Sequence, residues 1–582
     1  MTLAFIPPTL DQVLVGSIER SRHPDLKAAF LIGATERQFP TPIVFDSILS
    51  EQDRLTAQSQ GLELPPGVRQ ELANRRYLAY IALTRPSEFL CVTYPSADSK
   101  SNAVVRSPFV DDLCGLFNNL KEESVSSDIT IEEIYNSYDL EDMLCCRTGE
   151  TQSEGLLQDI LNDEQLSPIG SRVTRAINYE NKALLDDEVI RQLFGKHISS
   201  SASRLSTFAE CPYRHFARYV LDLKKRDEFK LEPLDVGEFF HRALDGFLKR
   251  VVTDKVHFET IQPAGLIKIL DEEVERLCLD DSFISKFRAH SSHNAFIVGS
   301  ALEYLRDCVI AVSQMVCAGS FRPLLSEISF GRPALSKAEG SKQTGDSVGE
   351  FKIALPDGRS LSLNGRIDRL DVANADGRKV ALVFDYKTSE SSFSWSQFHY
   401  GLDIQLAVYM LAVRNAARKV ADDIAGAFYL PIKPKMEEAD IGEFADKLPR
   451  FAHKARGVFN GEYAFLLDST AVKDSRFYNF YVTKDGDPYG KYNWLGALRP
   501  ADFVAFLDFA SRKISDLACQ IVSGKITAAP YRLNGVSPCS QCEYRPVCRF
   551  DWQINNYNLL VGVNKEHVLA GITKTNERKK DR

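Results

Sequence analysis

The sequence predicts a multidomain protein that combines α/β and α+β structure, and three observations lead to this prediction. The chain has 582 residues, and at roughly 150 residues per domain this length suggests about four domains. Its 44% hydrophobic and 26% charged residues are typical of a folded globular protein. Apolar runs of strand length alternate with helical patterns in the first 110 residues and again in the middle of the chain.

Neither a membrane segment nor a secretory signal is evident in the sequence. No apolar run reaches the roughly 18 residues that a membrane-spanning helix needs, and Pro7, Pro8 and Asp11 interrupt the first apolar stretch too early for a signal peptide. We therefore expect a cytoplasmic protein with no membrane partner. Twelve cysteines in such a chain are better interpreted as metal ligands, where they cluster, than as disulfides.

The formal charge of −8 is unevenly distributed. Between residues 111 and 165 the sequence has 15 Asp and Glu but only Lys121 and Arg147. The remainder of the chain therefore carries a small positive charge, which permits nucleic-acid contact without requiring it. We interpret the acidic stretch as a solvated linker or helical surface.

Changes in composition divide the chain into four regions. Residues 1–110 predict an α/β domain, because the apolar runs AAFLIGA and FLCVTY suit short buried strands and the stretch QELANRRYLAYIALTR before the second has a helical pattern. Residues 111–198 predict an acidic, partly helical connector. Residues 199–555 predict a second domain, and residues 556–582 a C-terminal tail.

The second domain begins with helical patterns and continues with strands. FKIAL, LSLNGRIDRLDV and KVALVFDYKT are apolar segments separated by the turn sequences PDGR and NADGR. These segments predict a three-stranded meander. A helical pattern, DIQLAVYMLAVRNAARKV, and another strand, GAFYLPIK, follow, so we expect an α+β core.

The meander places Asp368 on one strand, and Asp385 and Lys387 on the next. Because residues i and i+2 of a strand point to the same face, Asp385 and Lys387 should project together while Tyr386 points away. Two carboxylates can hold Mg²⁺ for attack of water on a phosphodiester, with a lysine nearby to steady the developing charge. A surface ion pair at a strand end is the alternative, and D-x-K alone is a weak indication.

Two further elements strengthen the case. Gln405 and Tyr409 are four residues apart in the following helix and should share one face, and His241 belongs to an earlier helix with an apolar stripe. The order His, G-R-I-D, D-Y-K, Q-x-x-x-Y resembles the RecB-type nucleases of the PD-(D/E)XK class, and four motifs in order are far more specific than one.

This resemblance implies a role for each residue. Lys387 would position the attacking water, and Gln405 and Tyr409 would contact the DNA strand or support the metal ligands. The implied ligands of Mg²⁺, or of Mn²⁺, are His241, Asp368, Asp385 and the backbone carbonyl of Tyr386.

A cysteine cluster lies near the C-terminus, where Cys539, Cys542 and Cys548 occur within ten residues. Such a group suggests a metal or iron–sulfur site that needs a fourth ligand. The segment ECPYRHFARY resembles the first cysteine motif of AddB-type nucleases, which implies a [4Fe-4S] cluster on Cys211 and these three. A structural zinc site on the same thiolates is the alternative. Spacing alone would equally allow Cys278, Cys308, Cys317 or Cys519.

The N-terminal segments around AAFLIGATERQFP and NRRYLAYIALTR resemble the end of a superfamily 1 helicase motor domain, in which a residue equivalent to Arg85 reaches the nucleotide γ-phosphate. No G-x-x-x-x-G-K-[ST] phosphate loop occurs in the chain. We therefore expect no ATP hydrolysis by this chain alone, and we expect a fragment, a truncated product or a split subunit. A salt bridge in a remnant domain would explain Arg85 equally well.

The resemblance covers residues 10–110 and 199–555. It implies a helicase-domain remnant followed by a PD-(D/E)XK nuclease domain that a four-cysteine cluster staples together. The implied function is metal-dependent exonuclease action on single- and double-stranded DNA ends during double-strand break repair, in an AddAB-type complex with an AddA-type helicase–nuclease subunit. Two alternatives remain. One is a non-catalytic DNA-binding scaffold, and the intact acidic motifs count against it. The other is a standalone iron–sulfur exonuclease resembling the CRISPR adaptation enzymes, and the helicase-like N-terminus counts against that one.

Overall fold

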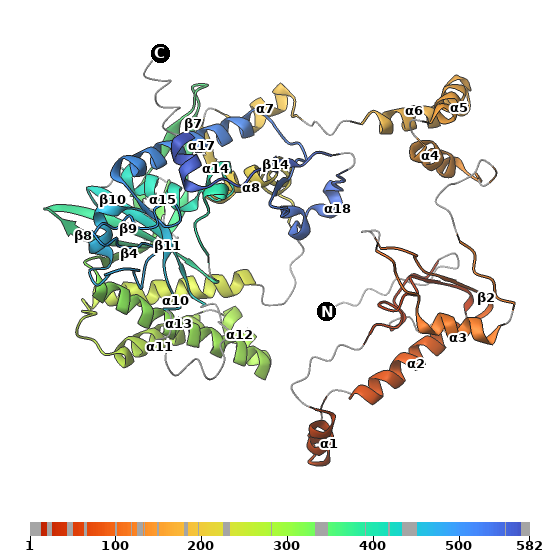
Figure 1. Ribbon diagram of the computed structural model, residues 1–582, viewed down its shortest axis with the longest axis horizontal. Helices are drawn as coiled ribbons and strands as arrows, with labels where there is room; N and C mark the ends of the chain where they lie inside the picture. Colours follow the sequence, from red (N-terminus) through yellow and green to blue (C-terminus); the bar gives the residue numbers. More distant parts are fainter. Residues whose placement is uncertain are drawn as a thin grey trace. The chain divides into compact units, whose positions relative to one another are not determined.

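The computed structural model of the chain (Figure 1) comprises two compact units, residues 1–170 and 171–582. No described helix combines the length and the apolar character that crossing a bilayer requires. The residues that the structure describes are 13–19, 26–42, 50–62, 64, 67–98, 102–117, 119–124, 132, 134–147, 150–179, 184–195, 197–224, 233–280, 282–331, 347–389, 391–416, 419–433, 451–552 and 555–571.

The smaller unit is built around a parallel pair of strands, β1 and β2, which pair from Leu26 with Pro86 to Ile32 with Thr93. The expected order of strand, helix and strand is confirmed. The expected burial of the strands is wrong, because Phe30 and Ile32 are 68% and 81% exposed. The bounds are β1 Leu26–Ile32, α1 Glu51–Ser59, α2 Val68–Thr84 and β2 Pro86–Thr93.

The exposure of these strands has a physical reason. Strands of parallel sheets are apolar throughout because both faces are normally covered, and this composition led to the expectation of burial. Among the described residues of this unit, the small core around Ala34, Phe39, Ala79 and Val110 covers only part of the pair.

The acidic connector is more helical than expected. Asn136 begins one of its helices by accepting hydrogen bonds from the backbone N–H groups of Tyr138 and Asp139, the favoured capping arrangement. The helices are α3 Pro108–Leu116, α4 Ser137–Cys146, α5 Thr151–Asn162, α6 Ser167–Ile177 and α7 Asp187–Leu193.

The larger unit contains a seven-stranded sheet in the order β12-β11-β10-β9-β8-β4-β5. β9 pairs in parallel with β10 and antiparallel with β8, and β8 pairs antiparallel with β4. Nearly every residue of β9 and β10 is buried, which explains their unbroken apolar runs. The bounds are β4 Arg322–Phe330, β5 Ser347–Gly349, β8 Gly365–Ala375, β9 Arg378–Lys387, β10 Asp423–Pro431, β11 Arg456–Asn460 and β12 Ala497–Leu498.

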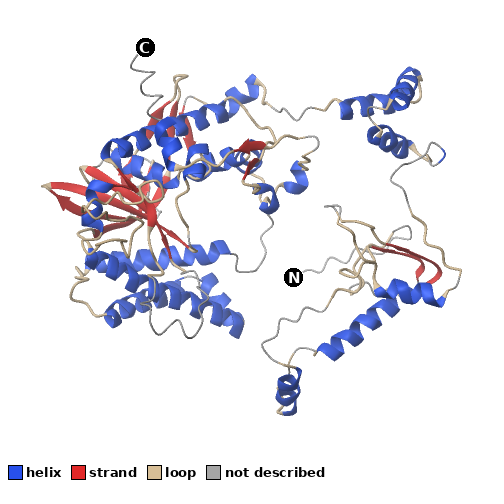
Figure 2. Cartoon of the chain, viewed as in Figure 1, coloured by secondary structure: helices blue, strands red, loops and turns tan. Residues whose placement is uncertain are grey.

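Helices cover both faces of this sheet, as Figures 1 and 2 show. One hydrophobic core lies between the sheet and α8, α15 and α17, and a second lies between the opposite face and α10, α11 and α13. The bounds are α8 Ala202–Glu210, α9 Pro212–His215, the π-helix η2 Phe216–Val220, α10 Pro233–Thr253, α11 Pro263–Asp280, α12 Ser282–His290, α13 Ser292–Ala318, α14 Trp395–Tyr400, α15 Gln405–Arg414, η4 Gly461–Tyr463, α16 Ala464–Leu467 and α17 Pro500–Val522.

The expected three-stranded meander is wrong in one respect. The segment LSLNGRIDRLDV forms two strands that belong to different sheets, β7 (Ser360–Leu363) and β8. β7 pairs with β3 (His197–Ser200) and β6 (Lys352–Ala354) in a small sheet, and the chain changes sheets at Asn364, whose N–H donates to the Ser200 carbonyl. Gly331 permits this approach, because a Cβ there would overlap the backbone of Leu363.

Residues of the expected C-terminal tail pack against this unit. β13 (Tyr531–Leu533) pairs in parallel with β14 (Asn558–Leu560), and residues 565–571 are helical. Lys565 is fully buried, and its ammonium donates to the carbonyls of Tyr492 at 2.7 Å, Leu495 at 3.1 Å and Ala497 at 2.7 Å. Between β13 and β14 lie η5 Pro538–Gln541 and α18 Arg545–Cys548.

Candidate active site

Two neighbouring strands supply the acidic residues of the site, as the sequence predicts. Asp368 lies on β8, and Asp385 and Lys387 lie on β9. The Lys387 ammonium is 2.6 Å from Asp385 Oδ2, and the backbone N–H of Tyr386 donates to Asp368 Oδ2 at 2.7 Å. The side chains of Asp385 and Lys387 therefore project together, and the Tyr386 peptide joins β9 to Asp368.

The N-terminus of α15 supplies the third part of the site. The amide nitrogen of Gln405 donates to Asp385 Oδ1 at 2.7 Å and to the Tyr409 hydroxyl at 2.8 Å. Its carbonyl oxygen accepts from Lys387 Nζ at 2.8 Å. Gln405 and Tyr409 share one helix face, as expected, and Gln405 holds Asp385 and Lys387 in place.

His241 reaches the site from α10, which packs against β4. Its Nδ1 lies 3.4 Å from Asp368 Oδ1 and 3.7 Å from Glu327 Oε1. Among the described residues, the ligand atoms of His241, Glu327 and Asp368 all lie within 4.8 Å of one another and could hold a metal ion. Sequence reasoning missed Glu327, although a single acid inside the apolar strand sequence LLSEISF was an available indication.

The crowding of charge perturbs the ionisation of these groups. Burial raises the pKa of the Asp385 carboxyl, and the negative charge of Asp368 raises it further, against the opposing effect of Lys387. Burial lowers the pKa of His241, but hydrogen bonds with Asp368 and Glu327 outweigh burial and raise it to about 10. The site thus gathers the carboxylates of Asp368, Asp385 and Glu327 beside an imidazole, and this set of oxygen and nitrogen donors fits a divalent cation.

A buried ion pair supports β8 from the opposite face. Arg369 and Asp371 are each 1% exposed, and the Arg369 guanidinium donates two hydrogen bonds to the Asp371 carboxylate. The Arg369 guanidinium also lies 4.4 Å from the centre of the Phe384 ring on β9. Because the pair is fully desolvated, loss of either partner would leave a buried charge, so β8 and β9 are held firmly beneath the acidic residues.

The cysteines form a second constellation. Cys211 is buried at the start of α9, and Cys539, Cys542 and Cys548 lie in or beside η5 and α18. Burial raises the pKa of the Cys211 and Cys548 thiols, and a smaller raising effect comes from Cys548 on Cys211 and from Cys539 and Cys542 on Cys548. Arg214 ties the two segments together, because it pairs with Glu210 at 2.7 Å and with Glu543 at 3.2 Å.

The surroundings of these sulfurs fit metal-bound thiolates. Burial raises the pKa of the Cys211 thiol to about 11, while backbone N–H groups of Arg214 and Tyr213 act in the opposite direction. Backbone N–H groups also donate to Cys542 and Cys548. Hydrogen bonds of this kind tune iron–sulfur ligands, and a buried thiolate needs a cation to offset its desolvation.

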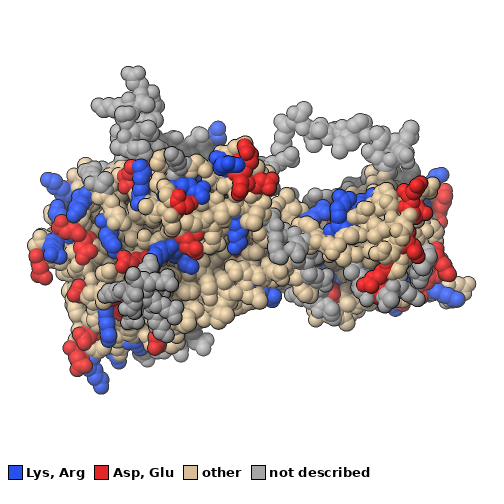
Figure 3. All heavy atoms as spheres, turned by 90° about the horizontal axis from the view of Figure 1, so that it is seen from above, with Lys and Arg blue, Asp and Glu red and all other residues tan. Residues whose placement is uncertain are grey.

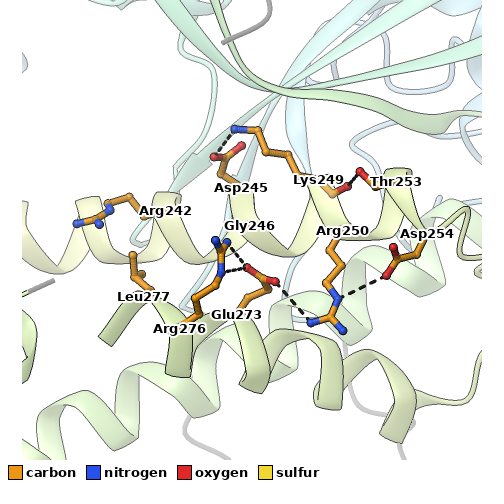
Figure 4. A pocket seen from close by; sticks show the side chains of 10 residues that line it. All are labelled: Arg242, Asp245, Gly246, Lys249, Arg250, Thr253, Asp254, Glu273, Arg276 and Leu277. Carbon is orange, nitrogen blue, oxygen red and sulfur yellow. Dashed lines mark hydrogen bonds and ion pairs between the residues drawn. The ribbon is translucent and has the colours of Figure 1, made fainter. Parts of the chain in front are cut away.

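A cavity of about 760 Å³ lies between α10 and α11, and Figure 4 shows its charged side chains. Glu273 lies 2.5 Å from Arg276 and 3.5 Å from Arg250, and Lys249 lies 2.8 Å from Asp245. The pair of Arg250 with Glu273 joins α10 to α11, whereas the other two pairs each lie within one helix. Figure 3 likewise shows acidic and basic side chains interspersed over the visible face of the larger unit, so phosphate contacts there would be local.

Arg85 lies at the C-terminal end of α2 in the smaller unit. Its role at a nucleotide, which the helicase resemblance implies, stays a prediction.

Known proteins show a consistent similarity. The chain is 30% identical over 576 residues to the B subunit of the ATP-dependent helicase/deoxyribonuclease of Symbiobacterium thermophilum and 31% identical over 581 residues to the protein of that name from Desulforudis audaxviator. Both alignments cover 95% of this chain and 48% of the relative. The Clostridioides difficile protein of that name is 29% identical over 97% of this chain and 50% of its own length.

The expected resemblance to B subunits of helicase–nucleases is thereby confirmed, and the chain spans about half the length of these relatives. Residues 199–549, which contain the acidic site and also Cys211, Cys539, Cys542 and Cys548, match the PD-(D/E)XK nuclease superfamily. Because this match extends over more than half of the chain, the protein belongs to the PD-(D/E)XK nuclease superfamily, whose members are metal-dependent nucleases.

Proposed function

We propose that this chain cleaves DNA with Mg²⁺, or Mn²⁺, bound at the site formed by β8, β9, α10 and α15. One observation carries the proposal: Gln405 contacts Asp385, Lys387 and Tyr409 at 2.7 to 2.8 Å. Side chains from two elements thus converge on one carboxylate that lies beside Asp368. The implied ligands are His241, Asp368, Asp385 and the Tyr386 carbonyl.

When bound, the cation supplies positive charge for the scissile phosphate and lowers the pKa of attacking water. Lys387 provides a further positive charge, and its side chain is 31% exposed, so it can reach a phosphate in solvent. Gln405 fixes the direction of Lys387. Burial raises the pKa of the Tyr409 hydroxyl well above its usual value, so this group stays neutral and supports Gln405 by hydrogen bonding.

We further propose a [4Fe-4S] cluster on Cys211, Cys539, Cys542 and Cys548. Support comes from the ion pairs of Arg214, which join the segments of Cys211 and of the three C-terminal cysteines, and from the raising effect of Cys548 on the pKa of the Cys211 thiol. The cluster would hold together segments more than 300 residues apart. A structural zinc ion on the same thiolates is distinguished by metal analysis.

The wider role that we propose is processing of single- and double-stranded DNA ends during double-strand break repair, in the cytoplasm, with an AddA-type helicase–nuclease subunit. The relatives are described as B subunits of ATP-dependent helicase/deoxyribonucleases, and residues 1–110 resemble part of a helicase motor. This chain would supply one nuclease site of the complex.

The test is degradation of labelled single-stranded DNA by the whole chain with and without Mg²⁺. Asp385→Ala and Lys387→Ala should each abolish cleavage and leave DNA binding largely intact, because each removes transition-state charge without unfolding β9. Lys379→Ala, at the solvent-exposed start of the same strand, is the matched control and should cleave normally. Full cleavage by both variants would exclude this site, whereas DNA binding without cleavage in the wild type would favour the scaffold alternative.

A further inference from the structure

Tyr429 lies beside the ammonium of Lys387, although none of the four nuclease motifs includes it. It belongs to β10, where it pairs in parallel register with Asp385 of β9, so its side chain points to the same face of the sheet as Asp385 and Lys387. The centre of its ring is 4.9 Å from Lys387 Nζ. We propose that Tyr429 is a positioning residue for DNA cleavage, and that its ring face holds the Lys387 ammonium in place for the substrate. This inference rests on the proposed nuclease function.

The distance between the two groups suits a cation–π contact. The face of an aromatic ring carries partial negative charge and attracts an ammonium within about 6 Å of the ring centre, most strongly where water is excluded. Tyr429 is 1% exposed, so water is excluded from its ring. The side chain of Lys387 is 31% exposed. The ammonium therefore contacts the buried ring and remains accessible to a phosphate from solvent.

The hydroxyl end of Tyr429 fixes the orientation of the ring. The hydroxyl donates to both carboxylate oxygens of Asp403, at 2.7 and 2.9 Å. Asp403 Oδ1 also accepts from the backbone N–H of Gln405 at 3.3 Å, at the start of α15. Burial raises the pKa of the Tyr429 hydroxyl well above its usual value, and the charge of Asp403 raises it further. The hydroxyl therefore keeps its proton and its hydrogen bonds to Asp403.

The ring gives Lys387 a contact that does not depend on Asp385. Lys387 Nζ is 2.6 Å from Asp385 Oδ2 and 2.8 Å from Gln405 Oε1. Asp385 is also an implied metal ligand, so a bound cation competes with Lys387 for its carboxylate. Gln405 and Tyr429 are not implied ligands, and both can still hold the ammonium when the cation is present. Tyr429 thus limits the movement of Lys387 during turnover and leaves the affinity for DNA largely to other groups.

The alternative is a purely structural role, in which Tyr429 anchors the start of α15 through Asp403. The two possibilities give importance to different parts of one side chain. If Tyr429 acts as an anchor, removing its hydroxyl impairs cleavage and changing the charge of its ring does not. If the ring face holds Lys387, the charge of the ring matters and the hydroxyl matters little.

The experiment compares two rings of nearly the same shape at this position in the whole chain. Tyr429→Phe keeps the ring, so its kcat for single-stranded DNA with Mg²⁺ should stay close to the wild-type value. In Tyr429→pentafluorophenylalanine the fluorines withdraw electrons, and the ring face repels a cation. Its kcat should be roughly tenfold lower than that of Tyr429→Phe with little change in KM, as expected for loss of a desolvated cation–π contact that acts in turnover.

Acetylation of Lys387 is a second measurement, made without metal and without DNA. The whole chain is treated briefly with limiting acetic anhydride, and the modified fraction of each lysine is measured by peptide mass spectrometry. An ammonium released from the ring moves more freely into solvent, so Lys387 should react severalfold faster in Tyr429→pentafluorophenylalanine than in Tyr429→Phe. Lys491 Nζ is likewise 4.9 Å from a tyrosine ring centre, that of Tyr481, and its acetylation should be equal in the two variants.

The same two substitutions at Tyr481 are the matched control. Tyr481→pentafluorophenylalanine should speed acetylation of Lys491 but leave kcat and the acetylation of Lys387 unchanged. Equal kcat and equal Lys387 acetylation in the two Tyr429 variants would overturn the inference, and so would a loss of cleavage already complete in Tyr429→Phe. Either result leaves the proposed function intact as long as Asp385→Ala still abolishes cleavage. Absence of cleavage by the wild type would instead overturn the proposed function.

Discussion

Gln405 is the residue that joins the two halves of the nuclease site. It contacts the carboxylate of Asp385, the ammonium of Lys387 and the hydroxyl of Tyr409, but it carries no charge and cannot itself transfer a proton at neutral pH. Its contribution is therefore to orient its neighbours. It keeps the Lys387 ammonium and the Asp385 carboxylate at a fixed separation while substrate enters.

Replacing Gln405 by leucine should impair turnover more than binding. Gln405→Leu has a similar volume but makes none of the three hydrogen bonds, so Lys387 gains freedom to turn toward solvent. We expect kcat for single-stranded DNA to fall roughly tenfold or more, with little change in KM, as when supporting groups of a metal site are lost. Gln520→Leu on α17, whose amide bonds only Asp516 among the described residues, is the control and should leave both constants unchanged.

His453 illustrates a titratable residue with a structural role. It is buried against Phe451, and its Nδ1 lies 2.9 Å from the Pro431 carbonyl. Burial lowers the pKa of His453 in the folded protein, against smaller raising effects of the Pro431 carbonyl and Asp307. The unfolded chain therefore takes up the proton more readily, so this residue's contribution to stability is present above the unfolded value of about 6.5 and is lost below it.

Urea unfolding at pH 7.5 and pH 5.5 tests this sign. In the wild type the free energy of unfolding should be lower at pH 5.5 than at pH 7.5. In His453→Gln this difference should be smaller. His567→Gln, which alters an exposed histidine, should retain the wild-type difference. An equal fall in the wild type and His453→Gln would assign the pH dependence to other groups.

The residues of the site differ in how far sequence could predict them. Asp368, Asp385, Lys387, Gln405 and Tyr409 follow from strand and helix periodicity, because their spacing along one element decides which of them face together. Glu327 could not be found in this way. Its position beside Asp368 and His241 depends on the pairing of β4 with β8 and on the packing of α10 against β4, and both are contacts between segments far apart in sequence.

At the level of elements, local pattern predicted β9, α15 and β10 well, because their apolar content is high enough to mark them whatever their neighbours. It predicted the β6–β7–β8 region less well. Each strand there was recognisable, but hydrogen-bonding partners are chosen by tertiary packing, and β7 pairs with β3, which lies 163 residues earlier at His197 and Ser360. The exposed faces of β1 and β2 show the same limit of prediction. An apolar composition indicates that a strand tends to be buried, but it does not show whether another element packs against that strand.

Lys565 makes the helical residues 565–571 part of the core. Lys565→Met preserves length and volume but leaves the buried carbonyl of Ala497 and the part-buried carbonyls of Tyr492 and Leu495 without this donor, at a cost of roughly 1 to 3 kcal/mol for each unpaired group. We expect the free energy of unfolding to fall by roughly 3 kcal/mol or more. Limited proteolysis should then cut first between Asn555 and Gly571.

Lys484→Met, which alters an exposed lysine, is the control for this element. It should leave both stability and the order of cleavage unchanged. Wild-type protease resistance in Lys565→Met would mean that the apolar contacts of this segment, and not its ammonium, hold it in place.

For the whole molecule, the proposed cluster links segments from opposite ends of the larger unit. Ligation energy becomes folding energy when a metal site closes a long loop. Protein purified without oxygen should therefore be brown and contain about four irons per chain. Cys211→Ala and Cys548→Ala should each remove the colour and lower protease resistance and DNA binding together.

Cys278→Ala changes a cysteine of α11 and should alter neither colour nor stability. Stoichiometric zinc in colourless, fully active protein would replace the cluster with a structural zinc site. Colour that persists in Cys211→Ala would show that a different cysteine supplies the fourth ligand.

The position of Lys565 also has a consequence for the timing of biosynthesis. A ribosome adds about 5 to 20 residues per second, so the roughly 350 residues from Cys211 to Lys565 take about 20 to 70 s to make. Asp385 and Lys387 leave the ribosome near the middle of this interval, before α17, the last three cysteines and the ammonium that closes the loop at Tyr492, Leu495 and Ala497. The nascent chain thus carries its acidic residues in an unfinished domain until Lys565 has been made, and the proposed nuclease site is assembled only after that point.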